Sequence, residues 1–295
     1  MSEAVGFIGV GAMGSAIASR LVDDYELFVN DRNPAVAEGL IERGATFASV
    51  DEIGAKCRYV FLSLPRPTDV LDLLLGEGKL ADQMRPGSVV IDTTTGSPTT
   101  DGQILEGLTA RKIDFCDAPI GGGVSRAAAG TAALMVGASA EVYERVKPLL
   151  FAVTQDVIHV GPAGSGHSAK LVNNLLNSCN RFAAMEAVRL GEVAGIPREV
   201  IVDVINRGSA RNYATENTYP QMLMGGTEEQ PYKLQNFTLQ LLDKDLRLAN
   251  KLAEDLNHDT PIGHLVQQLV DRAVERFGPN ADQSQMMWEW YADEK

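Results

Sequence analysis

The segment Val5-Gly6-Phe7-Ile8-Gly9-Val10-Gly11-Ala12-Met13-Gly14 joins a short apolar run to the glycine pattern G-x-G-x-x-G. The run predicts a buried strand, and the apolar spacing from Ala12 to Leu21 predicts a helix directly after it. Such glycines permit a tight turn, close approach of the backbone to a pyrophosphate, and close packing of the helix on the strand. The helix N-terminus then offers free N–H groups to the phosphates. A glycine-rich turn without a ligand is the alternative, and the flanking strand and helix disfavour it. The predicted dinucleotide-binding residues are Gly9, Gly11, Ala12, Met13 and Gly14.

A second predicted strand, Tyr25–Asn30, ends immediately before Asp31. A carboxylate about 20 residues past the first glycine accepts hydrogen bonds from the adenosine ribose and repels a 2′-phosphate, which favours NAD. Arg32 leaves NADP open as the cofactor, because a guanidinium pairs well with a phosphate. The alternatives for Arg32 are a solvated surface charge or a position over the adenine.

Composition limits the class of protein. The 295 residues are enough for two domains, and the hydrophobic (45%) and charged (22%) fractions are ordinary for a soluble globular protein. No apolar run approaches the length of a membrane span, and the chain begins directly with a predicted strand, so we expect a cytoplasmic protein. The net charge of −13 disfavours nucleic acid and membrane surfaces as partners. The cysteines are far apart and in no CxxC pair, so we predict neither a disulfide nor a metal site.

Strand-like and helix-like segments alternate up to about residue 160, which indicates a doubly wound sheet. Beyond the loop Gly161–Gly166, helical periodicity dominates, and the stretch Met224–Leu234 is a predicted surface loop. We therefore expect a dinucleotide-binding domain over residues 1–165 and an all-α substrate and oligomerisation domain over residues 166–295. The later strands of the first domain, all expected to be buried and parallel, are 59–64, 88–92, 113–117, 133–136 and 157–160. The helices expected in the second domain are 168–194, 239–256, 262–277 and 283–292.

Lys170 and Asn174 are four residues apart on the predicted long helix and therefore share a face. Asn177 and Arg181 extend this polar stripe, for which a solvated face is the simplest explanation. However, the helix begins at the domain junction, and ligands of such sheets bind at the carboxyl ends of the strands. A lysine there would lie beside the nicotinamide, and partial burial near a second cation would lower its pKa toward neutrality, as a proton carrier requires.

The segment Asp117–Gly123 follows another predicted strand. A glycine-rich turn at this place exposes the backbone N–H groups of Gly121, Gly122 and Gly123, which can bind a carboxylate. The spacing alone does not distinguish this site from a tight turn without a ligand.

A series of ordered motifs extends nearly from end to end of the chain: the glycine pattern of residues 9–14, Leu64-Pro65, Asp92-Thr93-Thr94-Thr95, Asp117-Ala118-Pro119, the G-x-G-x-x-x-K-L-x-N-N pattern of residues 164–174, and Lys244-Asp245-Leu246. In these motifs the chain resembles the β-hydroxyacid dehydrogenases. This resemblance implies an α/β Rossmann domain followed by an all-α domain, joined by a long interdomain helix, in a homodimer or homotetramer. The segment Asp31–Pro34 is similar to the version in a branch that prefers NAD.

The resemblance also implies residue roles. Lys170 is expected to be the catalytic acid/base, with Asn174 as its partner in orienting the substrate. Lys244 is expected at the acid group of the substrate and near the cofactor, with Phe237 beside it. The residues expected to line the nicotinamide part of the cofactor site are Leu64, Pro65 and Thr95.

Two positions depart from the family pattern. Gly121 stands where the family usually has a serine that binds the substrate carboxylate, so a hydroxyl donor is lost and room is gained. The sulfolactaldehyde reductase branch also has glycine there, but follows it with arginine, whereas Gly122 follows here. Arg211 stands in a segment where the family commonly has small residues. It either supplies charge for a second or bulkier anionic group or points outward from a loop.

The expected function is therefore hydride transfer between a nicotinamide cofactor and a small anionic 3-hydroxy acid or its semialdehyde. Two alternatives remain. An imine reductase on the same scaffold usually carries another residue in place of Lys170. A non-catalytic dinucleotide-binding module is favoured by the altered Gly121 motif alone.

Overall fold

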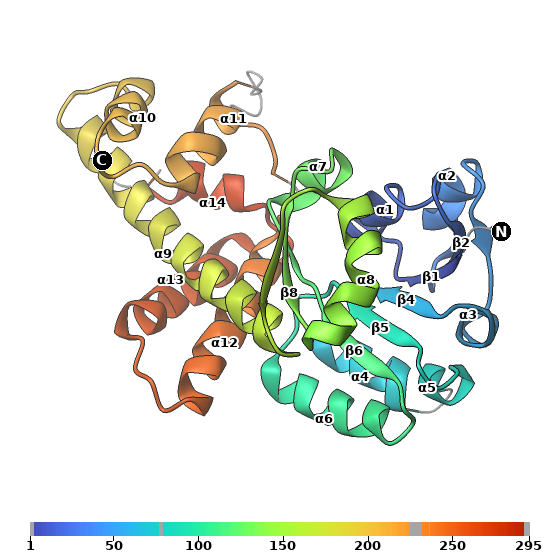
Figure 1. Cartoon of the computed structure of the whole chain (residues 1–295). Coiled ribbons are helices and arrows are strands. Elements are labelled where there is room, and N and C mark those ends of the chain that lie inside the picture. The colour runs from blue at the N-terminus through green and yellow to red at the C-terminus, as the bar shows by residue number, and fades with distance from the viewer. Residues whose placement is uncertain (1–2, 77–78, 225–231, 236, 292–295) are drawn as a thin grey trace. The chain divides into compact units, whose positions relative to one another are not determined.

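The computed structural model describes residues 3–76, 79–224, 232–235 and 237–291 (Figure 1). The chain divides into two compact units, Met1–Lys170 and Leu171–Lys295. The division falls inside the long helix α9, Ser165–Val193, a little beyond residue 165.

The first unit, the sheet unit, is built on one sheet with the strand order β3-β2-β1-β4-β5-β6-β8-β7, and β9 also pairs with β8. The order 3-2-1-4-5-6 is that of a doubly wound dinucleotide fold, whose ligands bind where the winding reverses, at the carboxyl ends of β1 and β4. The strands are β1 Ala4–Ile8, β2 Glu26–Asn30, β3 Thr46–Phe47, β4 Tyr59–Leu62, β5 Val89–Asp92, β6 Asp114–Asp117, β7 Ile120–Gly121, β8 Ala133–Gly137 and β9 Val157–Gly161.

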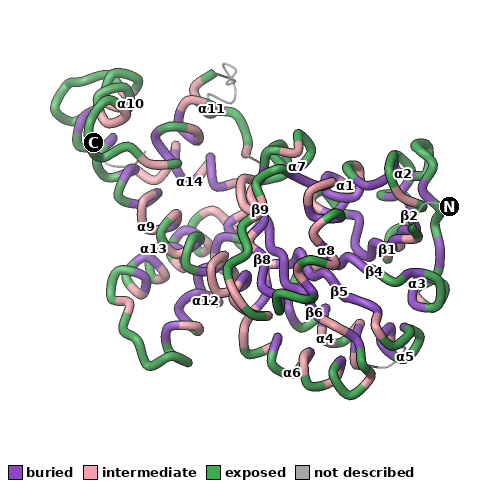
Figure 2. Tube along the Cα trace, viewed as in Figure 1, coloured by how far each residue is buried: buried purple, intermediate pink, exposed green. Residues whose placement is uncertain are grey.

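Two apolar clusters form the core of this unit. Phe7 belongs to one cluster and Ile8 to the other, because successive side chains of a strand point to opposite faces of the sheet. The central strands β4 and β5 are buried along their whole length, as expected for parallel strands covered on both faces (Figure 2). The helical segments of this unit before α9 are α1 Ala12–Ala18, η1 Pro34–Ala37, α2 Glu38–Ile41, α3 Val50–Lys56, α4 Pro67–Leu75, α5 Leu80–Gln83, α6 Pro98–Thr109, α7 Gly123–Ala128 and α8 Ala140–Val153.

The two strands predicted at 133–136 and 157–160 form, but not as buried parallel strands. β8 runs antiparallel to β6 and β7, because the chain returns through the short strand β7 and helix α7 beside the same edge of the sheet. β9 is parallel to β8 but largely exposed, with half of the Ile158 surface accessible. The prediction was therefore wrong in direction for β8 and in burial for β9. An apolar run indicates a strand but not the direction of its neighbour.

The second unit, the helical unit, contains no strand among its described residues beyond a single bridge between Thr238 and Asp282. The helices predicted at 239–256 and 262–277 are confirmed, as is the one from 283 within the described range. Residues 225–231 of the predicted surface loop lie outside the described residues. No described helix has the length and apolar character needed to cross a bilayer. Besides the greater part of α9, this unit comprises α10 Arg198–Arg207, the π-helical turn η2 Ala214–Thr218, α11 Tyr219–Leu223, α12 Leu239–Asp255, α13 Pro261–Phe277 and α14 Gln283–Glu289.

Candidate functional site

The glycine turn between β1 and α1 has the shape that its sequence predicts. Gly9 has a φ of +90°, and a Cβ there would collide with the carbonyl oxygen of Ser63. A Cβ on Gly14 would collide with the carbonyl oxygen of Gly9, so close packing of helix on strand excludes any side chain. Gly11 is exposed, and a Cβ there would meet nothing within 4 Å. The turn thus leaves open space beside backbone N–H groups, which fits a pyrophosphate.

Asp31 lies beside this turn at the end of β2. Its Oδ2 accepts a hydrogen bond from the Val10 N–H (2.9 Å), and its Oδ1 accepts one from the Asn33 N–H (2.9 Å). Each carboxylate oxygen keeps a second lone pair, so the half-buried group remains able to accept from ribose hydroxyls. Arg32 is exposed. The glycine turn and Asp31 together fit a dinucleotide.

The residues predicted to line the nicotinamide part of the site follow β4 and β5. The register pairs Ile8 with Leu62 and Leu62 with Asp92, so the carboxyl ends of β1, β4 and β5 are adjacent. Leu64 is fixed at this edge because its N–H donates to the Thr94 hydroxyl (3.0 Å). The sheet therefore brings the segments that carry Leu64, Pro65 and Thr95 to the edge where the glycine turn lies.

The segment predicted as a glycine turn contains more structure than expected. Gly121 belongs to β7, and Gly122 caps the N-terminus of α7. Gly122 and Gly123 have φ values of +114° and +80°, which favour glycine whatever the ligand. Their binding of a carboxylate stays a prediction.

Four buried ionisable side chains meet in the sheet unit: Asp92, Asp101, Asp117 and His167. Asp117, at the end of β6, accepts hydrogen bonds from the N–H of Gly164, just before α9 (2.6 Å), and from the N–H of His167 in the first turn of α9 (2.7 Å). The imidazole Nδ1 of His167 lies 2.8 Å from the Asp101 carboxylate, and its Nε2 lies 3.9 Å from Asp92. The sequence pattern did not predict this cluster, although Asp92 and Asp117 both end predicted strands.

The cluster shifts the protonation of its members. Burial raises the pKa of Asp92 to about 6 and also raises the pKa of Asp117. Burial opposes the charging of His167, but the hydrogen bond to Asp101 and the surrounding carboxylate charges outweigh it and raise its pKa to about 9. His167 is therefore an imidazolium at neutral pH, held among carboxylates. Although Asp101, Asp117 and His167 are close enough together to hold a metal ion, their mutual hydrogen bonds already account for the arrangement.

Lys170 lies three residues after His167 on α9 and is half-buried. Asn174, one turn further on, is buried, and its Nδ2 donates to the Asp245 Oδ2 (2.9 Å). The other oxygen of Asp245 lies 3.3 Å from the Lys244 ammonium. Within the helical unit, Asp245 thus contacts two predicted site residues, Asn174 and Lys244. The sequence assigns Asp245 no role beyond its place in the motif Lys244-Asp245-Leu246.

Two further predicted residues take no part in these contacts. Phe237 is half-buried, and its N–H donates to the Asp282 carboxylate (3.0 Å). Arg211 is exposed. The roles of both residues stay predictions.

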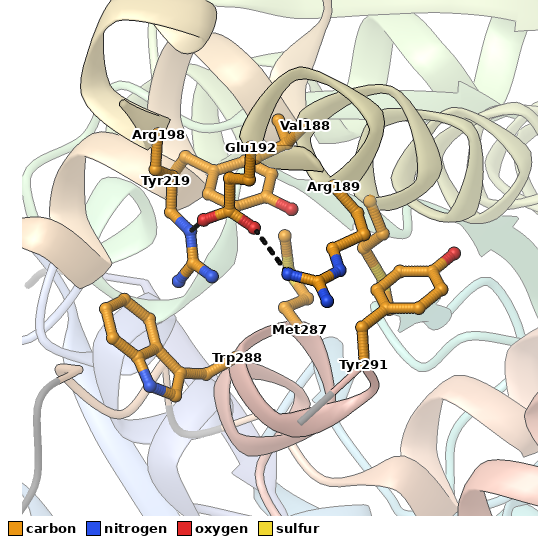
Figure 3. Close-up of a pocket in the computed structure, with 9 residues that line it drawn as sticks. Val188, Arg189, Glu192, Arg198, Tyr219, Met287, Trp288 and Tyr291 are labelled. Carbon is orange, nitrogen blue, oxygen red and sulfur yellow. Dashed lines mark hydrogen bonds and ion pairs between the residues drawn. The ribbon is translucent and has the colours of Figure 1, made fainter. Parts of the chain in front are cut away.

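A separate cavity of about 80 Å³ lies in the helical unit, lined by residues of α9, α10, α11 and α14 and by Tyr291 (Figure 3). Glu192 pairs with Arg198 (2.6 Å) and Arg189 (3.8 Å), and the Arg198 guanidinium lies 4.1 Å from the ring centre of Trp288. None of the predicted site residues lines this cavity. Both arginines of its wall pair with the one glutamate, Glu192.

Comparison with known proteins matches both units. Residues 4–161 match the family described as the NAD binding domain of 6-phosphogluconate dehydrogenase. Residues 164–290 match the family described as NAD-binding of NADP-dependent 3-hydroxyisobutyrate dehydrogenase.

Individual relatives extend over nearly the whole chain. A 2-(hydroxymethyl)glutarate dehydrogenase of Eubacterium barkeri is 32% identical over 90% of this chain and 88% of its own. An NAD-dependent L-serine dehydrogenase of Pseudomonas aeruginosa is 34% identical over 90% of each chain. The 3-hydroxyisobutyrate dehydrogenase of Mycobacterium tuberculosis, solved with L-serine, has a TM-score of 0.85 at 26% identity and covers 98% of this chain and 99% of its own.

A variant of an imine reductase from Myxococcus stipitatus, solved with NAD⁺, has a TM-score of 0.63 at 20% identity over 96% of this chain and 98% of its own. This likeness shows the shared fold alone.

Proposed function

Because the chain belongs to the β-hydroxyacid dehydrogenase family, we propose that it transfers a hydride between NAD(P) and a small 3-hydroxy acid or its semialdehyde. The observation that carries this proposal is the helix α9, which presents Lys170 and Asn174 on one face, with Asn174 fixed by Asp245. A protein that only binds a dinucleotide has no need of a lysine and a fixed amide at this place.

The hydrogen bond to Asp245 fixes the orientation of the Asn174 amide group, with Nδ2 toward Asp245. Asp245 accepts from Nδ2, and the amide oxygen accepts a long hydrogen bond from Asn173 Nδ2 (3.4 Å). The second lone pair of this oxygen remains as an acceptor for the Lys170 ammonium or for the substrate hydroxyl. Asn174 would thereby hold the reacting oxygen and Lys170 in hydrogen-bonding distance of each other.

Proton transfer is the task proposed for the protein. A bound nicotinamide supplies the hydride acceptor or donor. In the oxidation direction the Lys170 amine accepts the proton of the substrate hydroxyl, and in the reduction direction the Lys170 ammonium returns it. Lys244 neutralises the acid group of the substrate, with the N–H groups of Gly121 to Gly123 as further donors.

The cofactor site is proposed to favour NAD. Asp31 lies beside the glycine turn with lone pairs available for ribose hydroxyls, and its charge disfavours a 2′-phosphate. Exposed Arg32 is the group through which NADP would be accommodated.

We also propose that the protein is a homodimer or homotetramer that associates through α9. Apolar side chains that share one exposed face of this helix include Val172, Leu176 and Leu190. A second copy of the chain is the occupant that the family resemblance implies. A cytoplasmic location is supported by the three free cysteines, Cys57, Cys116 and Cys179.

Replacement of Lys170 tests the proposed reaction. Lys170→Ala is expected to lower turnover by about 100-fold or more, because it removes the proton carrier. NADH oxidation would be measured against a panel of semialdehydes, including methylmalonate, tartronate and succinate semialdehyde, and a cyclic imine would test the alternative chemistry.

The control is Lys233→Ala, which removes an exposed lysine from the same chain. Binding of NADH, followed by its fluorescence, is expected to persist in both variants. Near-normal turnover of Lys170→Ala would refute the assigned role, and turnover of the imine alone would favour the imine reductase function.

A further inference from the structure

Arg181 is a charged side chain buried in the helical unit, with 4% of its surface exposed. Its Nε has no hydrogen-bond partner, and the ion pairs among the described residues include none with its guanidinium. Burial lowers its pKa to about 10, so the side chain is still charged at neutral pH. A buried charge without a partner costs several kcal/mol, so its presence calls for a reason.

The nearby carboxylates are committed to other groups. Asp245 and Asp282 both act on Arg181 through their charge. However, Asp245 contacts Asn174 and Lys244, and Asp282 accepts hydrogen bonds from the backbone of Phe237 and other residues around the start of α14. The negative charge near Arg181 therefore leaves its Nε without a hydrogen-bond acceptor.

Arg181 lies on the face of α9 that carries the proposed reaction centre. It follows Asn174 by seven residues, which is about two helical turns or about 10 Å along the axis. Helical side chains lean toward the N-terminus, so this long side chain extends back toward Asn177 and Asn174. The Oδ1 of Asn177 is also buried without a hydrogen-bond partner. Two unsatisfied polar groups thus follow the Asn174–Asp245 pair on one helix.

We infer that Arg181, assisted by Asn177, binds a second anionic group of the substrate. The substrate class is then a 3-hydroxy acid with a second carboxylate on the substituent of C2, the carbon that also carries the first carboxylate and the reacting hydroxymethyl group. A guanidinium suits this task because its planar donors match the two oxygens of a carboxylate. This inference rests on the proposed function and narrows it from hydroxy acids in general to dianionic ones.

Three substrates with the same reacting hydroxymethyl group separate the contribution of the second carboxylate from that of the length of the substituent. 3-Hydroxyisobutyrate and 2-(hydroxymethyl)glutarate share a carboxylate and a hydroxymethyl group on one carbon. They differ only in the remaining substituent, methyl in one and carboxyethyl in the other. 2-(Hydroxymethyl)pentanoate has a tail of similar length without the charge. The wild-type enzyme is expected to have its highest kcat/KM with 2-(hydroxymethyl)glutarate.

Arg181→Met is expected to lower kcat/KM for 2-(hydroxymethyl)glutarate by about 10- to 100-fold, the range for loss of hydrogen bonds to a charged group. The values for the two monoanionic substrates should change little. The control is Arg207→Met, which removes an exposed arginine of the same unit and should leave all three values unchanged. An equal loss for all three substrates, or a wild-type preference for 3-hydroxyisobutyrate, would overturn the inference.

A binding measurement keeps this inference separate from the proposed reaction. Glutarate should raise the Tm of the NAD-bound wild type more than butyrate does, and this difference should vanish in Arg181→Met. Without ligand, the Tm of Arg181→Met should equal or exceed that of the wild type, because an unpaired buried charge has been removed. If the methionine variant does not fold, Arg181→Gln serves in its place, and unchanged protection by glutarate would overturn the inference. Absence of turnover with every hydroxy acid, despite protection by glutarate, would instead count against the proposed function alone.

Discussion

The buried cluster around His167 makes the stability of the protein depend on pH. The pKa of His167 is raised from an unfolded value of 6.5 to about 9 in the folded chain. A group with a raised pKa contributes its full stability below the unfolded value and loses it as the pH rises through the folded value. The window for this loss therefore extends from about pH 6.5 to about pH 9.

The expected size follows from the two pKa values. Each pKa unit corresponds to about 1.4 kcal/mol, so the free energy of unfolding should fall by about 3 kcal/mol across this window. Screening by solvent does not reduce this value, because His167 and its three carboxylate neighbours are buried. The loss is a large fraction of the 5–15 kcal/mol by which domains are typically stable.

Urea unfolding followed by far-UV circular dichroism, at several pH values across the window, measures the effect. Tryptophan fluorescence is unsuitable for this purpose, because Trp288 and Trp290 both belong to the helical unit. In His167→Gln the fall should disappear. The matched control, His258→Gln, removes an exposed histidine and should retain it. A fall that persists in His167→Gln, or one below about 1 kcal/mol in the wild type, would refute the assignment of an imidazolium to this cluster.

Two substitutions test the cofactor site and the reaction centre separately. Asp31→Ala should raise the use of NADPH relative to NADH, since it removes the carboxylate that repels a 2′-phosphate. The control is Asp23→Ala, which removes an exposed acid. An unchanged ratio of NADPH to NADH use in Asp31→Ala would show that Asp31 does not bind the ribose. Asn174→Asp should lower kcat by about 100-fold while NADH binding persists, because the new carboxylate would face that of Asp245. A change in KM without a change in kcat would contradict the proposed position of Asn174 beside the reacting oxygen.

The local features of the fold were predictable from the sequence. The glycine turn depends on residues within one strand–turn–helix unit, and the shared face of Lys170 and Asn174 follows from helical spacing alone. The direction of β8 was not predictable, because it depends on how the chain between β6 and β8 returns to the sheet. Apolar content gives no information on that path.

The His167 cluster and the burial of Arg181 could not be predicted for the same reason. His167 meets Asp92 and Asp117 because β5 and β6 are neighbours and α9 begins beside them, and it meets Asp101 through helix α6. Arg181 was recognised as part of a polar stripe, and a solvated face was the simplest explanation for it. Its burial depends on the elements that pack against α9, which helical periodicity does not specify. The pattern of apolar residues does not show which charged residues are buried. Their roles can be inferred only when their neighbours in the fold are known.

The anchoring of α9 explains how the proposed reaction centre keeps its geometry. The first turn of the helix is fixed to the sheet unit by Asp117 and by the contact of His167 with Asp101. Asn174 is fixed within the helical unit by Asp245. Lys170 and Asn174 nevertheless belong to one continuous helix, so their separation of about 6 Å along the axis is set by the helix itself. The spacing of the acid/base and its partner is therefore a property of α9 alone. A helix break between these residues, such as Leu171→Pro, should abolish turnover while the glycine turn retains its affinity for NADH.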